Sequence, residues 1–423
     1  MKLGNIGLAG LSLIGLGLAL TACAPPWRGP PDYDSIFDQD RLIEFNITIS
    51  DENWLKLIVD PKEYVEADLT VDGVLYPAVG LRLMGTKRKL KRNMRIRFNE
   101  FIADQRFFGV KRINLRNNDD DPTQVREALA LELFERAKLP ACLSSYVWVT
   151  KNGMDGSVYT LVEQVDKKFL ERNFGEDWGN LYKIERGGDL VYQGDAITEY
   201  PFLFESRYEK KTNEIQSDYG DLINLMKTLA LKDQAEFEES IQAILDIEQV
   251  LRALAVNTWL ANLDAYQGTV DNLFLYQAAG GHFKYSPWDL NLAFGNYHGG
   301  SCHYTTDELL ALSPMQPTCD GPRPLVTSLL SVGAFRQIYE NHLQELIDGP
   351  LHPDAVLNEI ERMRQLIKDR VVEDELTEFS SDEFDLSFSS DLPAGDNPVR
   401  IPGLEPFVLA RDRAIREYLE SSR

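Results

Sequence analysis

One short stretch, residues 262–295, constrains this chain more than any other. Apolar residues recur at helical spacing just before it, which predicts a helix that ends where the stretch begins. Within it, two short apolar runs flank Gly280-Gly281, and glycines supply the positive φ that a tight hairpin needs. The hairpin would hold three oxygen-bearing side chains at one end of a rigid element, two before its first strand and one after its second: Asp264, Asn272 and Asp289.

These three side chains allow two interpretations. Magnesium binds few carboxylates and leaves room for phosphate oxygens, so the cluster fits a Mg-nucleotide site. Phosphoryl-transfer enzymes use the same parts, with one Asp near the acceptor hydroxyl and an Asn and a second Asp on the metal. Asp and Asn beside turns also commonly shape the turn itself, and from spacing alone this second role is the commoner one.

Length and charge narrow the classes of function. The chain has 423 residues, enough for a large core and for two lobes or domains. It carries 67 acidic residues against 44 basic ones, a net charge of -23. This charge argues against nucleic acid or an anionic lipid surface as a partner.

The N-terminus has the features of an export signal. A single Lys2 precedes the apolar run 6–20, which is too short and too weakly flanked for a membrane-spanning helix. The run ends in Leu20-Thr21-Ala22-Cys23, which resembles the lipobox of bacterial lipoproteins. The resemblance implies that residues 1–22 are removed and that Cys23 is acylated. The alternative is an ordinary secretory signal with an incidental cysteine.

The mature protein would then be anchored by lipid to the bacterial cell envelope. Residues 23–41 are predicted to be a tether, because residues 24–36 contain four prolines. Ala24 is uncharged, which resembles sorting signals for the outer membrane of a Gram-negative cell.

Three further cysteines lie in this oxidising context. Cys302 and Cys319 flank a Gly-, Pro-, Ser- and Thr-rich segment, where a disulfide would stabilise the fold by about 3 kcal/mol. Cys142 begins an apolar run and is predicted to be a buried free thiol. No Cys or His spacing is typical of a metal site, and His298 and His303 are expected to be loop residues.

The first part of the chain alternates like a set of strands around one helix. Asp121 is a plausible N-cap for that helix, with Pro122 at its first position. Two strands follow, and the second ends at Glu163. Strands, a helix and two more strands is the order of a kinase small lobe, but neither G-x-G-x-x-G nor V-A-I-K is present.

A basic run at residues 86–97 stands out in so acidic a chain. Arg95 and Arg97 lie two residues apart, on one face of a predicted strand. Arginines there can bind phosphate oxygens in bidentate fashion. A solvated basic edge strand that resists aggregation is an equally good interpretation.

Beyond Glu163 the pattern becomes mainly helical. Residues 375–400 are acidic, Ser-rich and poorly periodic, and are expected to form a loop or flap.

Several motifs, in order from about residue 42 to 420, together resemble the CotH family of spore-coat-type atypical kinases. They are Val79-Gly80-Leu81-Arg82-Leu83-Met84-Gly85, Asp121-Pro122 with Val125-Arg126-Glu127, Tyr159-Thr160-Leu161-Val162-Glu163-Gln164-Val165-Asp166, Asn180-Leu181-Tyr182-Lys183, Asn262-Leu263-Asp264, Asp271-Asn272, Trp288-Asp289-Leu290-Asn291-Leu292-Ala293-Phe294-Gly295 and Gly403-Leu404-Glu405-Pro406-Phe407.

The resemblance implies an α+β, atypical protein-kinase-like fold in two lobes. Residues 42–163 would be a β-rich N-lobe with one helix, and residues 164–423 a mainly helical C-lobe carrying the hairpin. The implied activity is Mg-dependent (or Mn-dependent) transfer of phosphate from ATP to Ser or Thr of a protein whose identity the sequence does not give.

The resemblance also implies roles for single residues. Asp264 resembles the catalytic Asp, whereas Asn272 and Asp289 resemble metal ligands. Glu163 stands at the hinge-like position that meets adenine. Basic or phosphate-facing positions of the family are matched by Arg82, Arg95, Arg97, Arg126 and Lys183.

Two departures from the family pattern bear on activity. Asn291 stands where the family commonly has a second Asp, and Arg95 and Arg97 stand where it usually has lysines. Arg and Lys are not equivalent at a phosphate. Three functions therefore compete: an exported protein kinase, a nucleotide-binding or inert module that presents a surface, and a phosphotransferase acting on sugar or lipid.

Overall fold

The computed structural model describes residues 22–24, 26–85, 90–201, 203–215, 218–297, 302, 304–315, 319, 321–394 and 397–422. The predicted leader, apart from Ala22, lies outside this part of the chain, as do residues 86–89 of the basic run and both His298 and His303.

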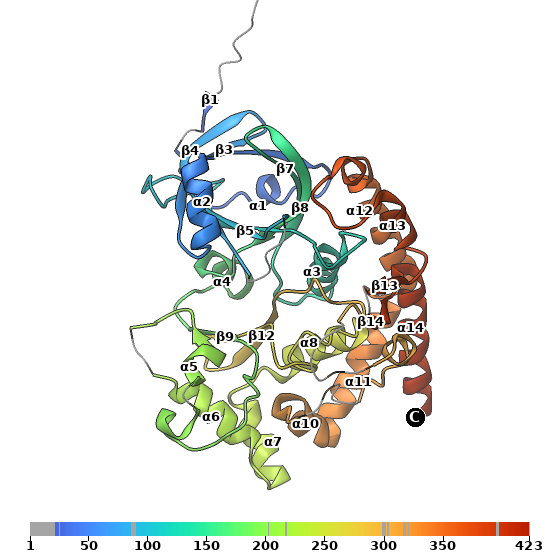
Figure 1. The fold of residues 1–423 in the computed structure, drawn as a ribbon. Helices are drawn as coiled ribbons and strands as arrows, with labels where there is room; N and C mark the ends of the chain where they lie inside the picture. The colour runs from blue at the N-terminus through green and yellow to red at the C-terminus, as the bar shows by residue number, and fades with distance from the viewer. Residues whose placement is uncertain are drawn as a thin grey trace, which may run out of the picture.

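The first half of the chain forms a closed β-barrel (Figure 1, top). β4 pairs with both β3 and β5, so the sheet order β4-β3-β2-β7-β8-β6-β5 returns to its start. The neighbouring pairs are antiparallel except β2 with β7, which is parallel. The strands are β2 (Ile43–Thr48), β3 (Val65–Val71), β4 (Val74–Leu83), β5 (Met94–Arg97), β6 (Arg112–Arg116), β7 (Ser144–Lys151) and β8 (Met154–Glu163).

Alternation in the sequence accounts for the barrel interior. On β2, for example, Ile43, Phe45 and Ile47 are buried while the residues between them are more exposed. Inward residues from all seven of these strands join one hydrophobic cluster, which fills the barrel. Helix α2 (Asp51–Val59) begins at Ser50, whose hydroxyl accepts a hydrogen bond from the Asn53 amide, and buries Leu57 in this cluster.

The helix after β6 begins later than predicted. α3 spans Arg126–Arg136, and Gln124 has a left-handed φ of 55°, which is incompatible with a helix starting at Pro122. Asp121 is therefore not the N-cap residue. Its carboxylate nevertheless accepts a hydrogen bond from the Arg126 amide at 2.8 Å, so it still satisfies a donor of the first turn.

The predicted helix and hairpin of the central stretch are confirmed. α8 (Ile247–Trp259) ends just before it, and β11 (Leu273–Gln277) pairs antiparallel with β12 (Phe283–Pro287). Gly281 has a φ of 88°, and its amide donates to the Ala278 carbonyl at the turn. The hairpin is joined by β9 (Asn180–Ile184) and β10 (Tyr208–Lys210) in a second sheet.

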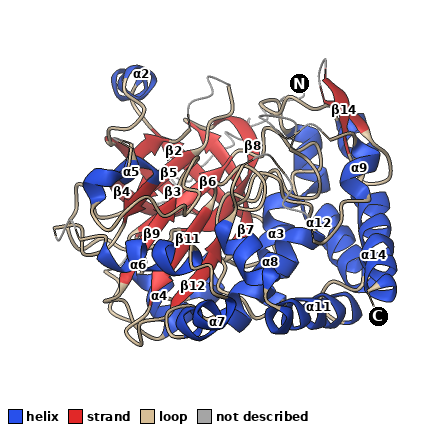
Figure 2. Ribbon diagram, turned by 90° about the horizontal axis from the view of Figure 1, so that it is seen from below, coloured by secondary structure: helices blue, strands red, loops and turns tan. Residues whose placement is uncertain are grey.

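Helices surround this second sheet and continue along one side of the barrel (Figures 1 and 2). They include α4 (Lys167–Phe174), α5 (Phe204–Arg207), α6 (Gly220–Leu229), α7 (Gln234–Gln242), α9 (Thr306–Leu310), α10 (Pro324–Ser331), α11 (Gly333–Asp348), α12 (Pro353–Glu373), α13 (Ser381–Leu386) and α14 (Leu404–Ser421), with a 3-10 turn at Ile197–Glu199. α12 reaches back from the helical part and contacts β8 of the barrel.

Residues 375–400 are more structured than predicted. They contain α13 and most of a small hairpin formed by β13 (Leu392–Ala394) and β14 (Asn397–Ile401). Phe384 and Phe388 are buried in the main hydrophobic cluster, which anchors this segment to the helices.

The predicted mixture of strands and helices is confirmed, and the division at residue 163 stays a prediction. Two hydrophobic clusters are present, one inside the barrel and a larger one among the helices. The larger cluster also includes α3 and outward residues of β7 and β8, such as Trp148 and Val162. The main core therefore extends across that sequence position.

Parts of the segment predicted to be a tether pack against the barrel, and the tether itself stays a prediction. Residues 22–23 form β1 (Ala22–Cys23), which pairs in parallel with the start of β4. A short helix, α1 (Tyr33–Ile36), follows, and Ile36 is completely buried in the barrel cluster. The prolines were compatible with a tether, but the apolar residues after them pack against the barrel.

The structure agrees with the predictions for three cysteines, and the acylation of Cys23 stays a prediction. Cys302 and Cys319 form a disulfide, and Cys142 is a buried free thiol whose pKa is raised by burial. Within the described ranges, none of the helices combines the length and the apolar character needed to cross a bilayer.

Candidate active site between the hairpin and the barrel

Asp264 and Asn272 lie together at the base of the hairpin, as predicted. The Asn272 Nδ2 donates to the Asp264 main-chain carbonyl at 2.8 Å and to its Oδ2 at 2.9 Å. Asn272 has a φ of 57°, a left-handed conformation that Asn tolerates. The amide group thus fixes the carboxylate of Asp264 and leaves its own Oδ1 without a hydrogen bond from the described residues.

The loop that carries Asp264 is held from two sides. Gly268 approaches the loop so closely that a Cβ there would lie 1.9 Å from the Leu263 carbonyl oxygen. Arg411 of α14 is completely buried, and its guanidinium donates to the Thr258 and Trp259 carbonyls at the end of α8. These contacts satisfy helix-end acceptors and position the chain that enters the loop.

Asp289 follows β12 and connects the hairpin to the barrel. Its Oδ1 forms an ion pair with Arg116, the last residue of β6. The Nε of Arg116 also donates to Glu127 of α3 at 3.0 Å. In kinases a strand lysine pairs with a helix glutamate. In this chain Arg116 contacts both a helix glutamate and the predicted metal ligand.

Asp264 and Asp289 line one cavity of about 220 Å³ between the barrel and the hairpin. Further charged residues of both signs line the same cavity, together with three amide side chains. They are Arg92, Arg116, Asp119, Asp120, Asn93, Asn117 and Asn291. Carboxylate and amide oxygens are the donors that Mg²⁺ and Mn²⁺ prefer, so the lining fits such an ion.

Among the described residues, no group of three or more His, Cys, Asp and Glu side chains is close enough to hold a metal. Magnesium usually keeps several waters and is completed by substrate phosphates.

The pKa of Asp264 is raised to about 7. The main cause is burial, and the nearby carboxylate of Asp271 adds to it. Arg186 and the hydrogen bonds from Thr269 and Asn272 act in the opposite direction. A carboxylate with a pKa near neutrality can accept a proton from a hydroxyl group more readily than an ordinary one.

Asp264→Asn is expected to stabilise the metal-free protein at neutral and higher pH. In the folded state the carboxyl stays protonated up to about pH 7, whereas it ionises near pH 4 in the unfolded chain. Stability should therefore fall between these two pH values in the wild type and not in the variant. We expect a gain of about 1–3 kcal/mol at pH 8 and almost none at pH 4, measured by urea unfolding. The exposed Glu239→Gln is the control, and an equal gain at both pH values would contradict this assignment.

Three of the predicted arginines lie on the outer face of the barrel. Arg82 and Arg95 are direct cross-strand neighbours, and Arg95 donates from Nε to Asn114 at 2.8 Å. Burial lowers the pKa of Arg95 to about 10, and the charge of Arg82 adds to this effect. The same face of β6 continues to Arg116 at the cavity. Arg97 forms an ion pair with Glu100 at 2.9 Å.

The other three residues predicted to contact the nucleotide form hydrogen bonds or ion pairs with other residues of the protein. Arg126 is completely buried and bound to Asp121, Thr123 and the Pro402 carbonyl, so its location does not support a phosphate contact.

Glu163 is also buried. Its carboxylate pairs with Arg172 and accepts from the Leu143 amide, and burial raises its pKa. Lys183 lies on β9 and pairs with Glu185. A role for either in binding adenine or phosphate stays a prediction.

Sequence analysis missed Arg116, Asp119 and Asp120. A signal was present, because five consecutive amide or acidic residues, 117–121, follow directly after strand β6. Polar side chains clustered at a strand end are common at binding sites. Only the barrel geometry shows that this end faces the hairpin.

Residues 84–387 match the family described as CotH kinase protein. Inner spore coat protein H of Bacillus subtilis (strain 168) is 25% identical over 289 residues, which cover 67% of this chain and 75% of that protein.

Among solved structures, the complex of the Shewanella oneidensis MR-1 toxin–antitoxin proteins HipA and HipB with operator DNA contains a similar chain. The TM-score is 0.35 at 12% identity, covering 89% of this chain and 71% of that one. The family match spans well over half of the sequence and includes the hairpin, Asp264, Asp289 and Arg116. The chain belongs to the CotH kinase protein family.

Proposed function

We propose that this protein is an exported kinase that transfers the γ-phosphate of ATP to Ser or Thr of a protein acceptor. The observation that carries the proposal is the convergence of Asp264, Asp289 and Arg116 on one cavity. Phosphoryl transfer depends mainly on positioning and charge stabilisation, which these groups supply.

Each side chain has a role in this scheme. Asp264 would orient the acceptor hydroxyl and take its proton, helped by its raised pKa. Asn272 would hold Asp264 and offer Oδ1 as a ligand, and Asp289 would be the second ligand. Mg²⁺ or Mn²⁺, when bound with ATP, would neutralise phosphate charge. Arg116, with Arg82 and Arg95 along the same face, would attract the phosphates.

One observation favours a second candidate, a nucleotide-binding pseudokinase or an inert envelope scaffold. Asp289 is engaged by Arg116, and Asn291 lines the cavity at the position where the family commonly has a second Asp. A metal would have to share Asp289 with this arginine. The name of the Bacillus subtilis relative, a spore coat protein, is compatible with a surface-associated scaffold as well as with a kinase.

Self-labelling distinguishes the two candidates. Residues 23–423 are incubated with Mg²⁺ or Mn²⁺ and ATP labelled on the γ-phosphate, and the labelled side chains are identified by mass spectrometry. Labelled Ser or Thr supports the kinase. Failure to bind Mg-ATP or Mn-ATP in calorimetry would assign the protein to the scaffold class.

We further propose that acylated Cys23 anchors the protein to the bacterial envelope. Cys23 is exposed on β1, at the edge of the barrel, where a modifying enzyme and a membrane can reach it. Cys23→Ser is expected to release the protein from membranes or to leave its leader uncleaved, as followed by fractionation. Cys142→Ala is the control. A Cys23→Ser protein that is processed and still membrane-bound would refute the anchor.

A further inference from the structure

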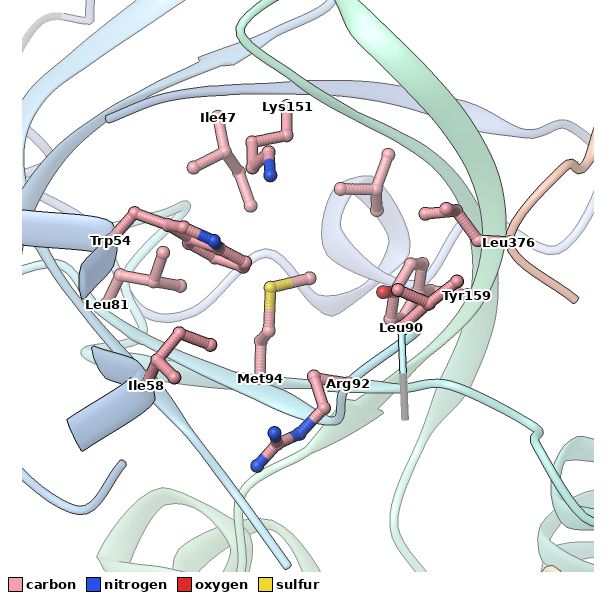
Figure 3. Close-up of a pocket in the computed structure, with 11 residues that line it drawn as sticks. Ile47, Trp54, Ile58, Leu81, Leu90, Arg92, Met94, Lys151, Tyr159 and Leu376 are labelled. Carbon is pink, nitrogen blue, oxygen red and sulfur yellow. The ribbon is translucent and has the colours of Figure 1, made fainter. Parts of the chain in front are cut away.

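A second cavity opens at the end of the barrel that α2 covers (Figure 3). Its volume is about 260 Å³, and most of its lining is apolar. Ile47 and Met94 come from barrel strands, Trp54 from α2 and Leu376 from the segment after α12. Asp264 and Asp289 do not line it, so it is distinct from the candidate active site.

A lysine enters this apolar space from an inward-facing position. On β7, Val147 and Val149 point into the barrel and are buried, and the next residue on that face is Lys151. Its parallel neighbour on β2 is Ile47, which is also buried. The alternation of β7 predicts an apolar residue at position 151. A charged side chain at this position needs a counter-charge or water.

The ammonium group of Lys151 is held by an aromatic ring. Its Nζ lies 4.1 Å from the centroid of the Trp54 ring, a cation–π contact. In Figure 3 it points into the cavity, whereas the guanidinium of Arg92 points away from it. Among the described residues that line the cavity there is no carboxylate, although the chain as a whole is strongly acidic.

The rim of the cavity exposes apolar side chains. Ile58 of α2 is 49% exposed and Leu90 is 83% exposed, and both line the opening. Leu55 and Val59 extend the same apolar surface along α2. Contiguous exposed apolar residues next to a cavity are typical of a binding site.

We propose that the barrel mouth binds a small amphiphilic carboxylate, of the class of medium-chain fatty acids. The acyl chain would occupy the apolar cavity, and the carboxylate would pair with Lys151. The volume lies just below the ~300–1,000 Å³ of pockets for drug-sized ligands, which favours a medium chain over a long one. The charge of the lining favours an anion over a neutral or cationic amphiphile.

Decanoate, used below its micelle concentration, is the test ligand, and binding to the full mature chain is measured by calorimetry without nucleotide. We expect saturable one-to-one binding. Lys151→Gln should weaken it about tenfold, because an ion pair that is partly shielded from water is lost. Lys232→Gln, at an exposed lysine of the helical part, should leave it unchanged. Decanol should bind less tightly than decanoate to the wild type.

Ile47→Phe provides an independent test, because the larger side chain would fill the cavity. Loss of decanoate binding, with an unfolding transition as cooperative as that of the wild type, is the expected result. Three outcomes would overturn the proposal: no saturable binding to the wild type, equal affinity for decanoate and decanol, or unchanged affinity in both Lys151→Gln and Ile47→Phe. None of these outcomes depends on whether the protein is a kinase.

Discussion

Asp264→Ala is expected to bind Mg-ATP nearly as well as the wild type and to lose phosphate transfer. Asp264 lies in the cavity beside Asp289, and its raised pKa suits it to accept the proton of the attacking hydroxyl. Loss of a positioned base typically reduces the rate by about 10²–10⁴-fold. Calorimetric binding and transfer of labelled phosphate, measured on the same preparations, separate the two effects.

Asp289→Ala is the companion variant and should lose nucleotide binding as well as transfer. It removes a predicted metal ligand, so nucleotide affinity that depends on Mg²⁺ or Mn²⁺ should be lost together with transfer. Asn272→Ala should lie between the two, since it loosens Asp264 and removes a ligand oxygen at once. If the wild type binds but does not transfer, and Asp264→Ala changes nothing, the protein is a nucleotide-binding pseudokinase.

The second large effect is expected at a buried ion pair that joins the barrel to the helices. The Nζ of Lys91 lies 2.9 Å from Asp374 at the end of α12, and both side chains are almost completely buried. Asp374 also accepts from the Ser157 hydroxyl at 2.7 Å and from the Val158 amide at 3.1 Å, both on β8. Burial lowers the pKa of Lys91, and Asp374 opposes this shift.

Asp374→Ala should reduce the free energy of unfolding by about 3–5 kcal/mol, because it leaves the buried Lys91 charge without a carboxylate and removes an acceptor from two donors of β8. Lys91 then keeps only its hydrogen bond to the Gln124 side chain, at 3.2 Å. Urea unfolding measures the loss. The double variant Lys91→Met/Asp374→Leu removes both charges and should cost much less than the single change. A single variant as stable as the wild type would show that water reaches Lys91 in solution.

Local patterns in the sequence were sufficient for several features. The helix before residue 262, the Gly-Gly hairpin and the alternation of the barrel strands depend on periodicity and turn chemistry within a few residues. The Cys302–Cys319 disulfide was predictable because the two cysteines flank one short segment rich in Gly, Pro, Ser and Thr. The proximity of Asp264 and Asn272 was also predictable from the sequence, since one short loop carries both residues.

Other features depend on pairs that are distant in the sequence. Arg116 and Asp289 are far apart in the chain and meet only because β6 ends opposite the hairpin. Lys91 belongs to a basic run. The residues around it in the sequence do not predict its buried ion pair with Asp374 at the end of α12. Arg126 has the surroundings of a helix-start residue, yet the Pro402 carbonyl and Asp121 bury it.

The sequence by itself therefore determined the helix before residue 262, the hairpin and the alternation of the barrel strands, because local sterics and side-chain type set them. The tertiary structure alone decided which charges form buried ion pairs and that α1 packs against the barrel. It also decided where the barrel leaves a cavity beside Lys151. The physical reason is that the free energy of a charged group depends mainly on its burial and its ion-pair partner in the folded protein. The residues next to it in the sequence have a much smaller effect.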